Sequence, residues 1–176
     1  DLIIAASEPE LRCFLDQGIE ESIGQIPIIM ANKKALEVGF DKLKTVEFLK
    51  SESLSYPRTK IVSQGPPEKI PCIMKSRTGS GSKSVHLLEE EELIDYFIRK
   101  YPDNIWQEYL EPDDQEYTCG LYRSQSKDIR TIIFKRALAG GRTGYGEVVE
   151  NSDINNLLIH IAEGLDLKGS INVQLR

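Results

Sequence analysis

The most informative segment of the chain is Pro71-Cys72-Ile73-Met74-Lys75-Ser76-Arg77-Thr78-Gly79-Ser80-Gly81-Ser82-Lys83-Ser84-Val85. Its apolar start predicts a buried strand, which delivers Lys75 to a run of glycine and serine. Glycines let backbone N–H groups approach phosphate oxygens closely, serine hydroxyls add donors, and lysine supplies a compact positive charge. Because the lysine precedes the glycines, the segment is neither a P-loop nor a dinucleotide-binding fingerprint. It fits a loop that holds a polyphosphate, and it also fits a flexible hairpin turn.

A second segment, residues 106–117, combines acids with predicted strands. It reads Trp106-Gln107-Glu108-Tyr109-Leu110-Glu111 and then, after Pro112, Asp113-Asp114-Gln115-Glu116-Tyr117. Glu108 and Glu116 are placed so that they could meet the adenine edge and the ribose hydroxyls of a nucleotide, with backbone groups near Tyr109 and Leu110 reading the purine. A solvated acidic loop is the alternative interpretation.

The N-terminal residues predict a βαβ fragment. Leu2 to Ala5 and Ile26 to Met30 are short apolar runs typical of strands. Between them, Ser7 and Glu10 have the spacing of a capping box at the start of a helix, and Gly18 supplies its stop.

The middle of the chain predicts helices around short strands. Helical spacing of apolar residues runs from Ala35 to Lys50, with Asp41 as an internal helix start. We expect a strand at Thr59 to Val62 and a helix from Leu88 to Lys100, headed by the four glutamates Glu89 to Glu92.

The C-terminal third predicts antiparallel strands and one helix. Strands are expected at 106–110, 117–122 and 129–134, the last two joined by a polar hairpin at 123–128, and again at 170–176. Gly140 to Gly146 is expected to be a flexible loop. Asp153 is expected to cap a helix that ends at Gly164.

Composition narrows the class of protein. The 176 residues suit one domain or two small subdomains, and 40% hydrophobic content is that of a globular protein. The net charge of -6 argues against a broad nucleic-acid or anionic-membrane surface, and no apolar run reaches the roughly 18 residues of a membrane span. Three widely spaced cysteines suggest neither disulfides nor a zinc site, which favours a reducing cytoplasm.

The order of these segments resembles the ATP-grasp superfamily, and specifically the large subunit of carbamoyl-phosphate synthase and its stand-alone relatives. Asp41-Lys42-Leu43-Lys44-Thr45 is similar to the helix that opens the ATP-grasp unit, and Pro57-Arg58-Thr59 to the strand start after it. The resemblance covers nearly the whole chain. It implies an α+β fold in which two α+β subdomains, residues 34–176, sandwich ATP. Residues 1–33 would be the C-terminal part of a Rossmann-like domain that precedes the ATP-grasp unit.

The resemblance also implies roles at the phosphate end of ATP. Lys42 matches the family's first phosphate-contacting basic position and Lys75 the second, which is the principal candidate for a catalytic residue. The segment from Gly79 to Ser84 matches the flexible loop over the phosphates. The loop residues expected to bind the nucleotide are Gly79, Ser80, Gly81 and Ser82.

Further roles are implied for the rest of the nucleotide and for the acceptor. Glu108 corresponds to the acid that starts the adenine hinge, Leu110 to a hinge residue and Glu116 to the ribose-binding acid. Gln174 matches a magnesium ligand, with Asn172 as a weaker candidate beside it.

Residues 135–147 resemble the strand and loop that border the acceptor site. Arg142, which with Lys75 is a predicted catalytic residue, and Arg136 could meet an acceptor carboxylate there, or they could be ordinary surface arginines.

The sequence departs from the family at three places. Ser76 stands where proline is usual and Ser84 where glycine is frequent, changes that keep hydrogen-bond donors in the loop. The Glu-x-Asn-Pro-Arg strand, which holds magnesium in the family, should follow Gln174 but the sequence stops at Arg176. Both ends look truncated, and we expect this fragment by itself to be catalytically crippled.

The implied activity is that of a carboxylate-amine ligase that uses ATP and magnesium (or manganese), in which a carboxylate or bicarbonate takes the terminal phosphate of ATP and an amine then displaces it. Small carboxylates and amines, and further domains or subunits, would be its partners. An ATP-grasp kinase and a non-catalytic module that binds a nucleotide or a partner are the alternatives. His86 and His160 are the only histidines, and nothing beside them suggests a hydrolase.

Overall fold

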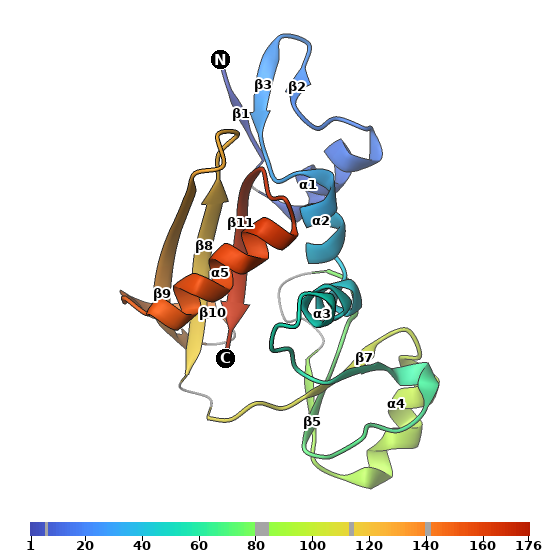
Figure 1. Cartoon of the computed structure of the whole chain (residues 1–176). Helices are drawn as coiled ribbons and strands as arrows, with labels where there is room; N and C mark the ends of the chain where they lie inside the picture. Colours follow the sequence, from blue (N-terminus) through green and yellow to red (C-terminus); the bar gives the residue numbers. More distant parts are fainter. Residues whose placement is uncertain (6, 80–84, 113–114, 140–141) are drawn as a thin grey trace. The chain divides into compact units, whose positions relative to one another are not determined.

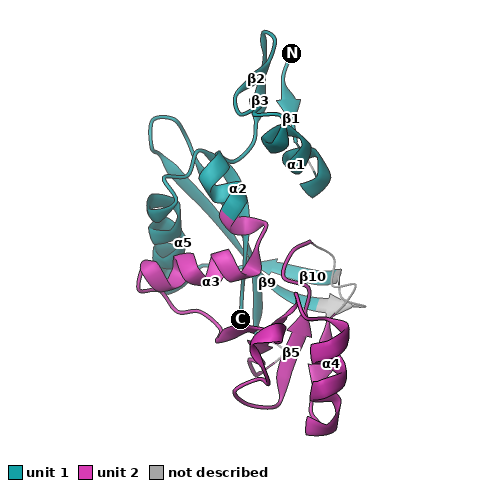
Figure 2. Cartoon of the chain, turned by 90° about the vertical axis from the view of Figure 1, so that its right-hand side faces the viewer, with its two compact units in different colours: residues 1–37, 113–176 teal, residues 38–112 magenta. Residues whose placement is uncertain are grey.

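The computed structural model describes residues 1–5, 7–79, 85–112, 115–139 and 142–176 (Figure 1). The side chains of Leu138, Ala139 and Arg142 also lie outside the description. The chain divides into two compact units, residues 1–37 with 113–176 and residues 38–112 (Figure 2). Helices and mainly antiparallel strands occur in both units, which confirms the predicted α+β class.

The N-terminal part of the first unit is the predicted βαβ fragment. Strand β1 (Ile3–Ile4) pairs in parallel with β3 (Ile26–Ile29), and α1 (Glu8–Asp16) lies between them in sequence. The capping box is confirmed: the Ser7 N–H donates to Glu10 Oε2 at 2.9 Å and the Glu10 N–H to Ser7 Oγ at 3.4 Å. A two-residue strand that was not predicted, β2 (Ser22–Ile23), adds an antiparallel edge to β3.

The larger sheet of the first unit has the strand order β10-β9-β8-β11 and is antiparallel throughout. Its strands are β8 (Glu116–Arg123), β9 (Ile129–Ala139), β10 (Arg142–Val148) and β11 (Gly169–Leu175). Helix α5 (Ser152–Gly164) lies across this sheet (Figure 1) and buries Leu158, Ile161 and Ala162. The predicted hairpin at 123–128 and the final strand are confirmed.

Two expectations for this unit are wrong. Most of the expected loop, Gly140 to Gly146, is strand, because residues 142–148 pair with 134–139 across a β-bulge between Thr143 and Tyr145; Gly140 and Gly141 lie outside the described residues. The N-cap of α5 is Asn151, whose Oδ1 accepts the Ile154 N–H at 3.0 Å, and Asp153 lies in the first turn. Asn and Asp cap helices about equally well, so composition alone does not separate the two positions.

The second unit contains a four-stranded antiparallel sheet in the order β4-β7-β5-β6. The strands are β4 (Thr59–Ile61), β5 (Cys72–Lys75), β6 (His86–Leu88) and β7 (Ile105–Glu108). The short 3₁₀ helix η1 (Val62–Gln64) and α4 (Ile94–Lys100) contribute to its core. The buried core residues are Val62, Cys72, Met74, Leu88, Phe97 and Trp106.

The predicted helix from Leu88 to Lys100 begins too early. Leu88 is fully buried in β6 opposite Cys72, and the exposed glutamates after it lead into a single 3₁₀ turn, η2 (Glu91–Leu93). Regular helix starts at Ile94. Pairing with β5 therefore overrides the helical spacing of the apolar residues at this end.

The helical stretch from Ala35 to Lys50 is divided at the predicted position. Helix α2 (Lys33–Gly39) ends before Asp41, which is the N-cap of α3 (Lys42–Ser51) and accepts the Leu43 N–H at 2.9 Å. Within the described ranges, no helix has the length and apolar character needed to cross a membrane.

Candidate nucleotide-binding site

Lys75 is the last residue of β5 and pairs with Ile105 of β7. Burial of the amine, together with the nearby positive charge of Lys42, lowers the pKa of Lys75 from 10.5 to about 8. The fold thus holds a cation where it is poorly solvated and beside another cation. An anionic ligand would offset both the lost solvation of the Lys75 amine and its repulsion by Lys42.

Lys42 comes to this place from the start of α3. Its Nζ donates to the carbonyl oxygen of Gly79 at 2.9 Å, and its backbone N–H donates to the carbonyl of Arg77 at 3.0 Å. The structure therefore brings together Lys42, Lys75 and Gly79, three residues that the sequence assigned to phosphate binding. Ser80, Gly81 and Ser82 lie outside the described residues.

Glu108 lies on the other face of the sheet from Lys75. In the antiparallel register Glu108 is opposite Cys72, whereas Lys75 is opposite Ile105, so the two side chains point to opposite faces. The Glu108 carboxylate accepts from the Arg58 guanidinium at 2.8 Å and from the Arg58 N–H at 3.1 Å. These bonds hold the pKa of Glu108 below its usual range.

Gln107 is the side chain at the end of β7 that shares the face of Lys75. It lies opposite Ile73, and its amide donates to Thr59 Oγ1 at 3.0 Å. The sequence prediction named Glu108 for the adenine hinge and did not consider Gln107. Side chains alternate between the two faces of a strand, so the face of Gln107 can be deduced from that of Lys75 only when the pairing register of the two strands is known.

The hinge residues follow directly after β7. Tyr109 and Leu110 are half-buried, and Tyr109 borders a hollow of about 110 Å³ that also touches Arg58, Trp106 and Glu108. Side chains of both faces of the sheet line this hollow, since Gln107 also borders it.

Glu116 opens β8 in the first unit and is engaged by two arginines. Its carboxylate accepts from Arg176 at 2.7 Å, and Arg136 Nε lies 3.4 Å from Oε2. Arg136, considered as a ligand of an acceptor carboxylate, therefore faces a carboxylate of the chain itself. Arg142 opens β10 opposite Ala139, and its side chain lies outside the described residues.

Gln174 is exposed on β11, opposite Thr118. Alternation places Gln174, Asn172 and Glu116 on one face of the sheet, but Asn172 Oδ1 already accepts a hydrogen bond from Thr118 at 2.8 Å. In the described part of the chain no group of three His, Cys, Asp or Glu residues could hold a metal ion. Magnesium binds through one or two carboxylates besides phosphate oxygens and water. One amide oxygen from Gln174 does not by itself make such a site.

The candidate residues are divided between the units. Residues 38–112 carry the lysines, Gly79 and the hinge positions 108–110, whereas Glu116, Arg142 and Gln174 belong to the first unit. The geometry of each group is established within its own unit.

Solved structures with the same fold include several enzymes. N5-carboxyaminoimidazole ribonucleotide synthetase from Thermus thermophilus is 16% identical with a TM-score of 0.71, over 98% of this chain and 50% of that one. L-amino acid ligase from Bacillus licheniformis is 14% identical with a TM-score of 0.62, over 97% and 49%. The biotin carboxylase domain of Hydrogenobacter thermophilus 2-oxoglutarate carboxylase, solved with MgADP and bicarbonate, is 11% identical with a TM-score of 0.69, over 98% and 44%. The chain spans about half the length of these proteins, and identities this low show the fold alone.

Among curated proteins none matches the sequence. The family model described as an ATP-grasp domain matches residues 40–175, which is most of the chain and includes the lysine pair, the hinge and Gln174. The chain belongs to the ATP-grasp domain family.

Proposed function

We propose that this chain is the ATP-binding part of a ligase that joins a carboxylate to an amine, resembling the large subunit of carbamoyl-phosphate synthase. The observation that carries the proposal is the buried amine of Lys75 beside Lys42, next to the glycine and serine segment. Two cations held together at a loss of solvation form a site prepared for a polyphosphate. The enzymes with the same fold, described as a synthetase, a ligase and a carboxylase, support this class of reaction.

In the proposed reaction, ATP transfers its terminal phosphoryl group to a carboxylate oxygen, giving an acyl phosphate and ADP. The nitrogen of an amine then attacks the acyl carbon, phosphate leaves, and an amide forms with loss of one proton. Lys42 and Lys75 would stabilise the charge that develops on the transferred phosphoryl group. Backbone groups of Tyr109 and Leu110, with Gln107 beside them, would bind the adenine, and Glu116 the ribose.

Several finer assignments belong to the same proposal. We place the ATP-grasp unit at residues 34–176 and the end of a Rossmann-like domain at residues 1–33. Magnesium or manganese would arrive on the phosphates of ATP, with Gln174 giving one oxygen. Arg142 would meet the acceptor carboxylate, and the protein would act in the cytoplasm with further domains or subunits.

Trapping of the acyl phosphate tests the proposed reaction. We expect the complete ligase, of which this chain is the proposed ATP-binding part, to release ADP in step with a hydroxamate when it is incubated with ATP, magnesium, hydroxylamine and a panel of small carboxylates. From bicarbonate the trapped product would be N-hydroxycarbamate. An ATP-grasp kinase would instead form a phosphoester stable to hydroxylamine. Absence of both products, with ATP still bound, would point to the non-catalytic module.

The affinity for ATP is expected to fall as pH rises through about 8, where Lys75 loses its proton in the ligand-free chain. Bound phosphate favours the charged amine, so the pKa of Lys75 rises in the complex and binding takes up a proton in this window. Calorimetry at about pH 8, in two buffers with different ionisation enthalpies, measures that uptake.

The matched control for the pH dependence is Lys75→Arg. A guanidinium keeps its charge throughout this range, so the affinity of the variant should be flat. An equally flat profile in the unmodified chain would show that Lys75 does not contact the nucleotide.

A further inference from the structure

Arg77 and Asp41 form an ion pair in the second unit that is closed by three short contacts. Arg77 Nε lies 2.9 Å from each carboxylate oxygen of Asp41, and the Arg77 guanidinium donates to Asp41 Oδ2 at 2.7 Å. The Asp41 side chain is largely covered, and the pair keeps the pKa of Asp41 below its usual range. A planar, forked pair of this kind fixes orientation as well as distance.

Backbone contacts strengthen the same junction. Asp41 and Thr78 form an isolated antiparallel bridge, and the Lys42 N–H donates to the carbonyl of Arg77. Asp41 also caps α3 through the Leu43 N–H. Thus one carboxylate joins the start of α3 to the residues that follow β5.

The place of this junction in the sequence gives it a consequence for the lysines. Asp41 directly precedes Lys42, and Arg77 comes two residues after Lys75. Lys42 and Lys75 repel each other, so keeping the two amines close together requires that the segments carrying them be held in place. The bonds between Asp41 and Arg77 fix the segments from which both lysines extend.

We propose that Asp41 and Arg77 are positioning residues, whose ion pair keeps Lys42 beside Lys75 so that the phosphate site is formed before nucleotide binds. This inference rests on the proposed function only for the identity of the ligand. The competing role for Arg77 is direct contact with phosphate. Two of its five N–H donors, the Nε–H and one on Nη2, are engaged by Asp41 through three contacts, which ties the guanidinium to this carboxylate and favours the positioning role.

The test is a double-mutant cycle with Asp41→Asn, Arg77→Met and the double variant. Asparagine keeps the helix cap while removing the charge, and methionine keeps much of the length of the arginine stem. Three quantities are measured: MgATP affinity by calorimetry, the titration of Lys75 in the ligand-free chain by NMR, and the melting temperature. Arg12→Met, which removes a partly buried ion pair of the same 2.7 Å length to Glu8 in α1, is the control.

Each single variant is expected to weaken MgATP binding about tenfold. The double variant should bind MgATP no more weakly than either single variant, because the two residues act as one unit. Without the pair Lys42 can move away, so the pKa of Lys75 should rise from about 8 toward its ordinary 10.5. Arg12→Met should change neither quantity.

Three outcomes would overturn the positioning role. A loss of affinity in Arg77→Met alone would make Arg77 a phosphate ligand. A lower melting temperature, with affinity and Lys75 titration unchanged, would leave the pair a purely structural role. An unchanged Lys75 titration in the double variant would show that Lys42 stays in place without the pair. If the unmodified chain fails to bind ATP while the Lys75 titration still responds, the proposed function fails and the coupling of the two lysines stands.

Discussion

Replacing Lys75 with methionine is expected to weaken MgATP binding by about 3 kcal/mol, or roughly a hundredfold, which is within the usual cost of removing one partner of a buried charged contact. The folded chain should not lose stability, because burial and Lys42 disfavour the charged amine that the substitution removes. Calorimetric titration with MgATP and thermal melting of the same samples measure both quantities. Lost affinity without lost stability separates a binding residue from a packing residue.

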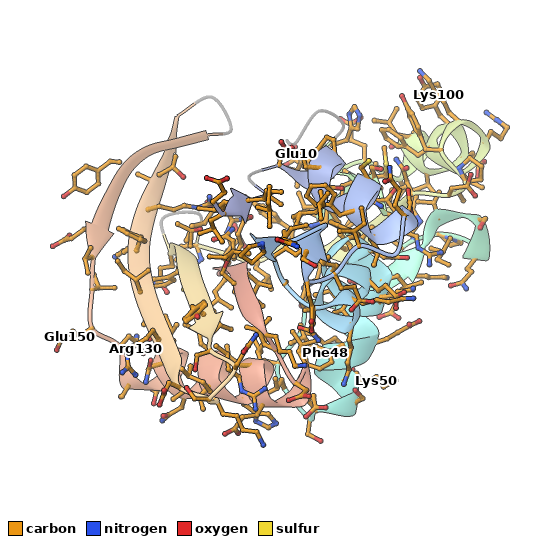
Figure 3. All side chains as sticks on the ribbon, turned by 90° about the horizontal axis from the view of Figure 1, so that it is seen from above. Glu10, Phe48, Lys50, Lys100, Arg130 and Glu150 are labelled. Atoms are coloured by element: carbon orange, nitrogen blue, oxygen red, sulfur yellow. The ribbon has the colours of Figure 1, made fainter. Side chains whose placement is uncertain are left out.

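Lys50→Met is the matched control for Lys75. Lys50 is an exposed lysine in the last turn of α3, the helix that begins with Lys42 (Figure 3). Its replacement should leave MgATP affinity unchanged. Equal affinities for Lys75→Met and the unmodified chain would remove Lys75 from the site.

Gly169→Ala is expected to have the largest effect on stability. Gly169 has a φ of 86°, which disfavours any residue with a Cβ, and a Cβ there would lie 2.2 Å from the carbonyl oxygen and 2.8 Å from the carbonyl carbon of Met30. Both neighbours are backbone atoms, so relief requires β11 to move away from the segment that joins β3 to α2. We expect the free energy of unfolding, measured with urea, to fall by about 3 kcal/mol or more, the sum of backbone strain and overpacking.

Gly18→Ala separates these two contributions. Gly18 has a similar φ of 68°, but a Cβ there would meet no atom within 4 Å. For Gly18→Ala the free energy of unfolding should therefore fall only by the cost of backbone strain, about 1 to 2 kcal/mol. If both variants lose the same amount, close contact with Met30 is not what requires glycine at position 169.

Sequence reasoning succeeded where the signal is local. The capping box at Ser7, the helix start at Asp41 and the hairpin at 123–128 all depend on residues a few positions apart. The predictions were wrong where pairing with a strand distant in sequence determines the secondary structure. Leu88 belongs to β6 because it pairs with Cys72, and residues 142–148 form a strand because they pair with β9.

The same distinction applies to the candidate site. The order of segments was enough to nominate Lys42 and Lys75, which the structure places close enough for the charge of one to lower the pKa of the other. The opposite faces of Glu108 and Lys75, and the side-chain position of Gln107, follow from the register of β5 and β7, which no spacing in the sequence states. The ion pair of Arg77 with Asp41 joins residues 36 positions apart and was missed for the same reason.

The most direct measurement is lysine acetylation of the chain with and without MgATP, followed residue by residue by mass spectrometry. Nucleotide should protect Lys42 and Lys75 from the reagent, while the exposed Lys50 and Lys127 react at unchanged rates. Lys75 that reacts equally fast in the presence of saturating MgATP would contradict the assignment of the nucleotide site to this lysine pair.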